Sequence, residues 1–126
     1  MASLKGDEHT RQLVRGLMEG IQASFQDRLF DERRGCFADA NIDGELSEKA
    51  SEHASMSAIC FGLCADDKTK RIVHKLYERG EPTTAETQPF FTTVVLKALD
   101  RIGRFDLALQ VIRDRWGKRM LDKGAT

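Results

Sequence analysis

The segment from Ala54 to Ala65 contains no charged residue, and this feature constrains the fold more than any other. A helix that is apolar nearly all round is buried on more than one side. A second segment, from Pro89 to Leu96, is also free of charge. Each is followed by an amphipathic stretch, at 67–79 and at about 105–115. Buried and half-buried helices are therefore expected to alternate along the chain.

Apolar residues recurring at steps of three and four predict five helices. Ser47 and Ser51 are good N-caps for the second helix, and Pro89 fits the first turn of the fourth. The expected helices are 9–30, Ser47 or Ser51 to about Ala65, 67–79, Pro89 to about Ile102 and about 105–115. The remaining segments are expected as a polar turn at 31–35, a short extended piece at 36–40, a glycine turn at 41–45, a polar loop at 80–88, a helix end at Trp116-Gly117 and a turn or frayed end at 118–126.

A weak internal repeat relates the second and third helices to the fourth and fifth. A shift of 35 positions places Ile59 on Val94 and Ile72 on Leu107. Repeated helix pairs build either a solenoid or a closed α/α toroid, and the tetratricopeptide pattern of Trp, Gly and Pro is missing. Alternating burial favours two concentric layers. The predicted fold is all-α, a partial α/α toroid of about five alternating inner and outer helices.

Composition narrows the class of protein. The 126 residues predict a single domain, and 40% hydrophobic with 32% charged residues predicts a real core. Twenty Lys and Arg cancel 20 Asp and Glu, which argues against nucleic-acid binding. No apolar run approaches the roughly 20 residues that cross a bilayer. The start MASLKGDEHT lacks a signal-peptide core, so we expect a cytoplasmic protein if this start is natural, with residues 1–10 disordered or introduced by cloning.

The odd number of cysteines, three, argues against a closed disulfide framework. His53, Cys60 and Cys64 could share one helix face and bind zinc, with Cys36 as a fourth ligand. Their spacing is not that of a zinc finger or ribbon. The favoured interpretation is that small, soft side chains fill a tight helix interface. We therefore expect neither a metal nor a cofactor.

The starts of the two apolar helices carry the residues best suited to a polar ligand. Glu52 and His53 could direct a carboxylate and an imidazole at it, or serve helix capping and the core. Gln88 beside Phe90 and Phe91 suits the polar edges and apolar faces of a sugar, or marks a helix start with a core anchor. The expected substrate-binding residues are Glu52, His53, Gln88, Phe90, Phe91 and Trp116, the last of which could instead be a hydrophobic plug.

Several segments resemble the six-hairpin catalytic domain of bacterial α-L-rhamnosidases. They are LKALDRIGRFDLAL at 96–109, IRDRWG at 112–117, KGAT at 123–126, FDERRGCFAD at 30–39 and SEHA at 51–54. The resemblance covers roughly residues 20–126, and the order and spacing of the segments are more specific than any one of them.

This resemblance implies an (α/α)6 barrel and inverting hydrolysis of terminal α-L-rhamnosides. Inversion uses a carboxylic acid and a carboxylate about 6.5–9.5 Å apart. In such proteins the general acid lies upstream of this chain, and the general base is a Glu in a Trp-Glu segment just after Gly124-Ala125-Thr126. The resemblance therefore implies a fragment that lacks both catalytic carboxylates and supplies part of the wall of a pocket for a rhamnoside-type carbohydrate.

Two other interpretations remain open. A stand-alone helical interaction module would bind a peptide or partner helix, and a metal protein built on His53, Cys60 and Cys64 is a remote third. Large apolar side chains of the inner helices cannot all be hidden in a five-helix layer, which predicts a homo-oligomer through those helices unless the chain collapses into a bundle. These side chains are Met56, Ile59, Phe61, Phe90, Phe91 and Val95.

Overall fold

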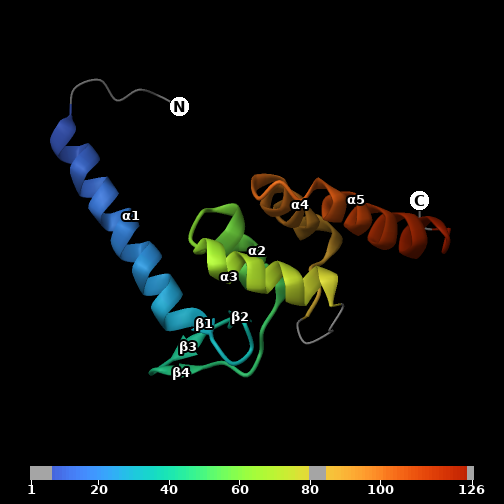
Figure 1. Cartoon of the computed structure of the whole chain (residues 1–126), viewed down its shortest axis with the longest axis horizontal. Coiled ribbons are helices and arrows are strands. Elements are labelled where there is room, and N and C mark those ends of the chain that lie inside the picture. The colour runs from blue at the N-terminus through green and yellow to red at the C-terminus, as the bar shows by residue number, and fades with distance from the viewer. Residues whose placement is uncertain (1–6, 80–84, 125–126) are drawn as a thin grey trace.

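The chain is mostly helical, as the sequence predicts. The structure is a computed structural model and describes residues 7–79 and 85–124. Its helices are α1 (Glu8–Leu29), α2 (Glu52–Cys60), α3 (Asp66–Val73), α4 (Thr92–Arg101) and α5 (Phe105–Ile112). Figure 1 shows α1 extending to one side of the other helices and the strands below them. None of the helices within the described ranges is both long and apolar enough to cross a membrane.

The first helix closely matches its expected range. The Asp7 carboxylate accepts a hydrogen bond from the backbone N of Thr10 at 3.0 Å and so caps the N-terminus of α1. The irregular start expected over residues 1–10 therefore does not include Glu8 to Thr10, while residues 1–6 lie outside the described part. Residues 80–84 of the predicted polar loop and residues 125–126 also lie outside it.

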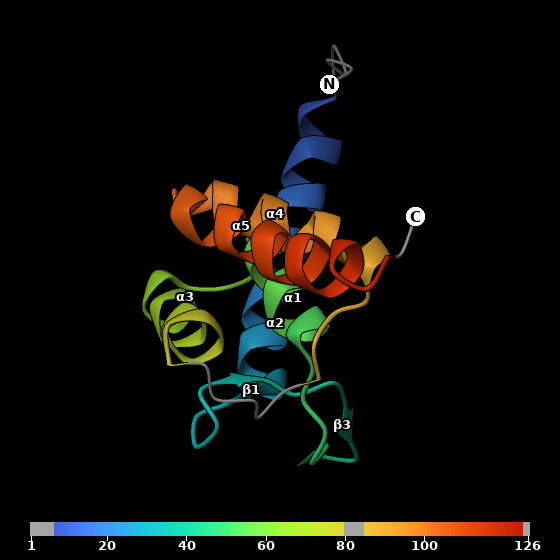
Figure 2. The same ribbon diagram turned by 90° about the vertical axis from the view of Figure 1, so that its right-hand side faces the viewer.

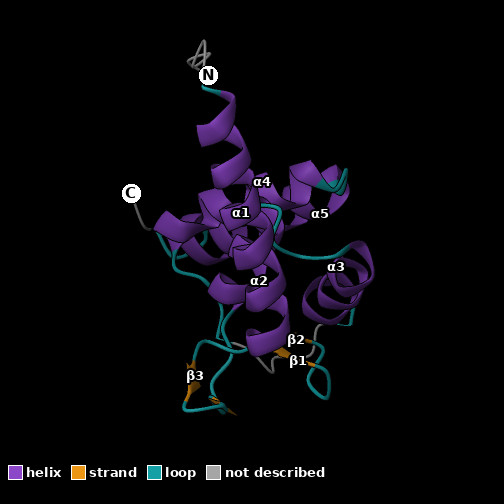
Figure 3. Cartoon of the chain, turned by 90° about the vertical axis from the view of Figure 1, so that its left-hand side faces the viewer, coloured by secondary structure: helices purple, strands orange, loops and turns teal. Residues whose placement is uncertain are grey.

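Two short hairpins connect α1 to α2 (Figure 3). Strand β1 (Phe30–Asp31) pairs with β2 (Cys36–Phe37), and β3 (Asn41–Ile42) pairs with β4 (Glu45–Leu46), both antiparallel. Asp43 and Gly44 have positive φ angles of 53° and 92°, which is the backbone of a two-residue type I′ turn. The glycine turn predicted at 41–45 is thus the tip of a hairpin.

Two predicted helix ends are wrong. Helix α2 stops at Cys60 rather than near Ala65, because Gly62 adopts a left-handed φ of 73° that terminates the helix. Helix α5 does not close at Trp116-Gly117, since it continues as a π-helical segment, Arg113–Leu121. A shorter π-helical turn, His74–Glu78, extends α3, and a 3₁₀ turn, Pro89–Phe91, precedes α4 with Pro89 in the predicted first turn.

Helices α2 and α4 pack side by side at the centre of the core and run in the same direction. At their starts, the His53 and Phe91 rings lie 4.3 Å apart. At their ends, the Arg101 guanidinium lies so close to Gly62 that a Cβ there would be 2.9 Å from it. Helices α3 and α5 flank this pair (Figure 2). The core side chains of the four helices are Met56, Ala58, Ile59, Ile72, Val73, Val95, Ala98, Leu99, Leu107, Ala108 and Val111.

The burial pattern corrects the shift of the internal repeat for the first helix of each unit, α2 in one and α4 in the other. A shift of 40 aligns buried residues of α2 and α4 at four positions, whereas a shift of 35 places buried Ile59 on half-buried Val94. The four pairs are Glu52 with Thr92, Ser55 with Val95, Ala58 with Ala98, and Ile59 with Leu99. The shift of 35 suits α3 and α5, where Ile72 and Leu107 are both buried. Helices α3 and α5 begin 39 residues apart. A shift of 35 differs from that spacing by four residues, about one helical turn, so it still places the same helix faces on one another.

Burial also corrects the side chains expected at an oligomer interface. Met56, Ile59 and Val95 are buried within the chain itself, while Phe61 and Phe90 are 69% and 93% exposed. Five large apolar side chains are instead exposed along α1, which buries none of its residues. We define the α1 stripe as Leu13, Val14, Leu17, Met18 and Ile21, which are 47–65% exposed.

Candidate functional site

The Glu52 carboxylate is the centre of the best-formed polar cluster. It lies buried at the start of α2, only 3% exposed. Its Oε1 accepts hydrogen bonds from the Tyr77 hydroxyl and from Nη2 of Arg115, the latter at 2.8 Å. Its Oε2 accepts a hydrogen bond from the backbone N of Thr87, also at 2.8 Å. Both carboxylate oxygens are therefore occupied by groups of the chain itself.

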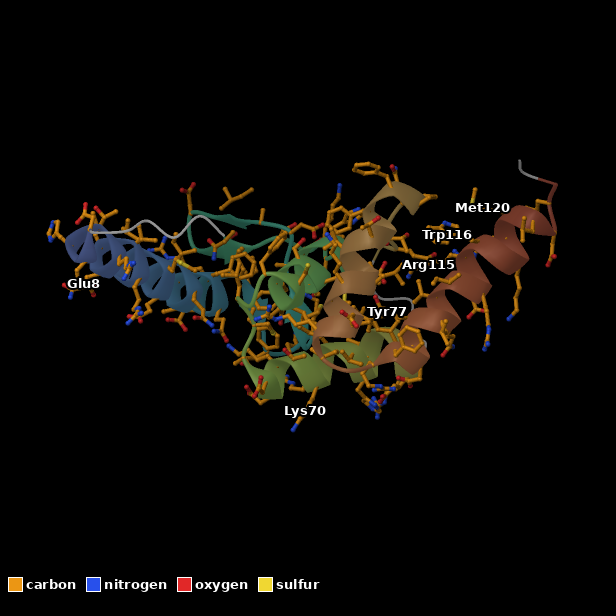
Figure 4. The ribbon with its side chains drawn as sticks, turned by 90° about the horizontal axis from the view of Figure 1, so that it is seen from above. Glu8, Lys70, Tyr77, Arg115, Trp116 and Met120 are labelled. Atoms are coloured by element: carbon orange, nitrogen blue, oxygen red, sulfur yellow. The ribbon has the colours of Figure 1, made fainter. Side chains whose placement is uncertain are left out.

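Arg115 joins this cluster to the segment that leads into α4. Its Nη1 donates to Oγ1 of Thr87 at 2.9 Å, and its Nε pairs with Oε1 of Glu86 at 2.6 Å. Arg119, four residues further along the same π-helical segment, pairs with the other oxygen of Glu86. In Figure 4, Tyr77 and Arg115 lie near each other, with Trp116 and Met120 beyond Arg115 on the extension of α5.

Opposing effects act on the pKa of Glu52. Burial raises it, but the hydrogen bonds from Arg115, Tyr77 and the backbone of Thr87 favour the anion and lower it below its ordinary value of 4.5. Burial and the neighbouring Glu52 anion raise the pKa of Tyr77, so its hydroxyl remains a proton donor. Glu52 is thus held as a buried anion with hydrogen bonds to both oxygens, which makes it a positioning residue.

His53 and Phe91 form a second contact between the starts of α2 and α4. Their rings are tilted by 49° to one another at the 4.3 Å separation, and both are half-buried. Ser51 is the N-cap residue of α2, as predicted, but its hydroxyl donates to Oδ1 of Asp39 at 2.6 Å instead of closing the first turn. The start of α2 is consequently fixed by tertiary contacts.

Trp116 lines a small cleft beside the polar cluster. The cleft has a volume of about 170 Å³, and its walls combine an indole, two guanidinium groups, two threonines and apolar side chains. Its lining residues are Thr87, Pro89, Thr92, Arg115, Trp116, Arg119 and Met120. None of these is a carboxylate, so the cleft offers hydrogen-bond donors and an aromatic face but no acid–base pair.

The structure brings together some of the residues expected to bind substrate. Glu52, His53 and Phe91 meet at the helix starts, and Trp116 follows Arg115 in the adjoining cleft. Gln88 and Phe90 are exposed to solvent. Sequence reasoning missed Tyr77, Glu86, Thr87 and Arg115, which complete the cluster. A carboxylate at the start of a buried helix requires a cationic partner, but nothing in the sequence identifies which distant Lys or Arg that partner is.

The cysteines do not come together with His53. Helix α2 ends at Cys60, and Cys64 lies beyond the Gly62 turn, so the helix face proposed for a zinc site does not exist. Among the residues that the structure describes, no three His, Cys, Asp or Glu side chains are grouped so as to hold a metal ion. Burial raises the pKa of Cys36 and of Cys64, which favours the protonated thiol at both positions.

Comparison with known proteins gives no match to this chain, whether among protein-family models, curated proteins or solved structures.

Proposed function

We propose that this chain is a wall segment of an (α/α)6 glycoside hydrolase domain of the α-L-rhamnosidase kind. In this proposal the chain supplies side chains that contact a rhamnoside-type carbohydrate, and the two carboxylates for inverting hydrolysis come from elsewhere in the parent domain. Glu52 shapes the pocket wall and has no part in proton transfer, because it is buried and hydrogen bonds from Tyr77, Thr87 and Arg115 hold it as an anion.

The observation that carries the proposal is the parallel packing of α2 and α4. Their starts meet through His53 and Phe91, and their ends meet at Gly62 and Arg101. The outer helices run back: the extension of α3 brings Tyr77 to Glu52, and the extension of α5 brings Arg115 to the same carboxylate. Stacked helix pairs, in which alternate helices are parallel, are what both toroids and solenoids require.

The cleft beside Trp116 is the sugar-contacting surface in this proposal. An indole face suits the apolar face of a pyranose ring, and guanidinium groups donate hydrogen bonds to hydroxyl groups. Arg119 is the best donor to test, because it is 58% exposed and pairs only with Glu86 among the described residues. Arg115 is less available, since Glu52, Thr87 and Glu86 all bind it.

Titration of the ¹⁵N-labelled chain with L-rhamnose, followed by NMR, tests this surface. We expect amide shifts around Thr87 and Arg115 to Met120, weaker in Arg119→Ala and unchanged in Lys118→Ala, whose side chain is 74% exposed on the same helix. L-fucose, a 6-deoxyhexose of different hydroxyl configuration, is the specificity control. Identical responses to both sugars, or no response at this cleft, would remove the basis for a rhamnoside-binding role.

The α1 stripe supports a second candidate function, a helical module that binds a partner helix or peptide. Its five exposed apolar side chains form the kind of contiguous patch that marks an interface. A rhamnosidase domain would cover this patch with its own helices, whereas a module would present it to another protein. Failure of the L-rhamnose titration, together with saturable binding of an amphipathic helical peptide to α1, would favour the module.

A further inference from the structure

A hollow with a strongly basic lining lies between the β1–β2 turn and α3. Its volume is about 300 Å³. Apart from Gly35, every lining residue within the described ranges carries a cationic or imidazole side chain: Arg33, Arg34, Arg71, His74, Lys75 and Arg79. This basic hollow shares only His74 with the larger cleft on the other side of α3, and it shares no residue with the cleft beside Trp116.

Hydrogen bonds to backbone carbonyls hold three of these cations in place. Nη2 of Arg71 donates to the carbonyl of Glu32 at 2.8 Å, and Nζ of Lys75 donates to the carbonyl of Arg34. Arg34 itself donates to the carbonyls of Ser47 and Glu48 at 2.7 and 2.6 Å. The turn and α3 are therefore fixed to one another by the same side chains that line the hollow, so the charges are organised before any ligand arrives.

The π-helical turn helps to keep the basic side chains of α3 and its extension on one side of the helix. Arg71, Lys75 and Arg79 are spaced four residues apart, and the turn His74–Glu78 lies between the first and the last. In a regular α-helix, residues eight apart diverge by about 80° around the axis. A wider π-helical turn reduces this divergence, and such turns are frequent at functional sites.

The positive charge of the hollow is only partly neutralised. Asp31 pairs with Arg34, Glu32 pairs with Arg71, and Glu78 pairs with His74. Within the described part of the chain, neither Arg33 nor Lys75 pairs with a carboxylate. In a protein whose formal net charge is zero, this is a local excess of cations that an anion would stabilise.

We propose that the basic hollow binds the phosphate group of a small phosphorylated ligand. Guanidinium groups match the tetrahedral oxygens of phosphate with paired hydrogen bonds, and the Lys75 ammonium adds a point charge. The exposed Glu32–Arg71 pair is no obstacle, since surface ion pairs contribute little and a dianion can displace one. A small ligand is favoured over a nucleic acid because the basic lining is confined to a hollow of about 300 Å³.

Inorganic phosphate, pyrophosphate and glucose 6-phosphate, titrated at constant ionic strength, are the probes. We expect amide shifts confined to Arg33–Gly35 and Arg71–Arg79, with saturation by phosphate and none by chloride. Arg33→Ala removes an exposed cation whose side chain makes no hydrogen bond or ion pair among the described residues, and it is expected to weaken phosphate binding about tenfold. Lys75→Gln should weaken it as well, and Arg15→Ala, which removes an exposed cation on α1, should not.

Three results would overturn the proposal. One is equal phosphate affinity in the native chain, Arg33→Ala and Lys75→Gln. Another is a response to chloride equal to that of phosphate, which would reduce the effect to general screening. The third is binding of a single-stranded RNA or a sulfated oligosaccharide at the hollow when all three phosphate probes fail. Circular dichroism of each variant confirms that it is folded before its affinity is compared.

Discussion

The Glu52 carboxylate and the Arg115 guanidinium lie 2.8 Å apart, although 63 positions separate them in the sequence. Their side chains are 4% and 14% exposed. This ion pair connects the start of the central helix α2 to the π-helical extension of α5, with Tyr77 and Thr87 completing its hydrogen bonds. Among the ion pairs of the described residues, this pair joins the two residues that are furthest apart in the sequence.

Removing one partner of this pair should destabilise the chain strongly. Glu52→Ala leaves the buried Tyr77 hydroxyl without its acceptor and leaves Arg115 with Glu86 as its remaining carboxylate partner. Breaking a buried pair costs about 3–5 kcal/mol, and the Glu86 pair places this loss at the lower end of that range. Urea unfolding measures the loss. Asp114→Ala is the control, because it breaks the exposed Asp114–Lys118 pair and should change stability little. Equal effects of the two substitutions would mean that Glu52 is not held as described.

Acid should remove the stabilisation that Glu52 provides. Its pKa is lower in the folded chain than its ordinary value of 4.5, so the unfolded chain takes up a proton first as the pH falls. The contribution is complete above pH 4.5 and is lost as the pH decreases towards the folded-state pKa. We expect the difference in unfolding free energy between the native chain and Glu52→Gln to shrink over that range, measured by urea titrations at several pH values. A difference that stays constant on acidification would contradict the lowered pKa.

The α1 stripe should drive self-association of the isolated chain. Burial of one large apolar side chain is worth roughly 1.5–3 kcal/mol, and this stripe presents five that are about half exposed. Light scattering after size exclusion should give a mass above 14.2 kDa for the native chain and 14.2 kDa for the double variant Leu17→Lys, Ile21→Lys.

Phe90→Lys is the informative comparison for this interface. Phe90 is the most exposed of the six side chains expected to join the inner helices, so an inner-helix interface would be broken by its substitution. If Phe90→Lys dissociates the oligomer and the α1 variant does not, association uses the inner helices after all. A native chain that is monodisperse at 14.2 kDa would exclude both interfaces.

The isolated chain should not hydrolyse an aryl α-L-rhamnoside. None of the described residues that line the cleft beside Trp116 is a carboxylate, and a general acid and a general base each contribute on the order of 10²–10⁴-fold. Release of the chromogenic aglycone over that of a buffer blank is the measurement. Turnover that disappears on Glu52→Gln, in a variant shown to be folded, would contradict this prediction and give Glu52 a catalytic role.

Periodicity was sufficient to predict where helices form, but not where two of them stop. The uncharged segment continues to Ala65, and its apolar character hides the left-handed turn at Gly62 that ends α2 at Cys60. Likewise, Trp116-Gly117 is a reasonable stop signal in isolation. The segment remains helical because Arg115 and Arg119 on either side of Gly117 are held by Glu52 and Glu86, which are tertiary contacts that no local pattern encodes.

The candidate site was predictable only in part, for the same reason. The sequence analysis selected the first residues of the two apolar helices as candidates, and three of these, Glu52, His53 and Phe91, do lie together. The sequence contains 20 Lys and Arg, and choosing Arg115 as the partner of Glu52 requires knowing that the extension of α5 returns to the start of α2. The same limitation applies to the basic hollow, where residues of the 33–35 turn meet the far side of α3.

Because α1 projects outward from the rest of the fold, its two ends should open, and exchange their backbone amide hydrogens, at different rates. Near the C-terminal end, Gln22 donates to the carbonyl of Gly62 at 3.0 Å and Phe25 lies 5.0 Å from Phe37, so opening there disturbs the rest of the fold. Towards Glu8, the helix depends on its own hydrogen bonds, and isolated helices of fewer than about 12–15 residues are marginal in water. Backbone amides of the first turns should therefore exchange with deuterated solvent far sooner than those near Phe25, and slow exchange along the whole helix would report that its apolar face has been covered.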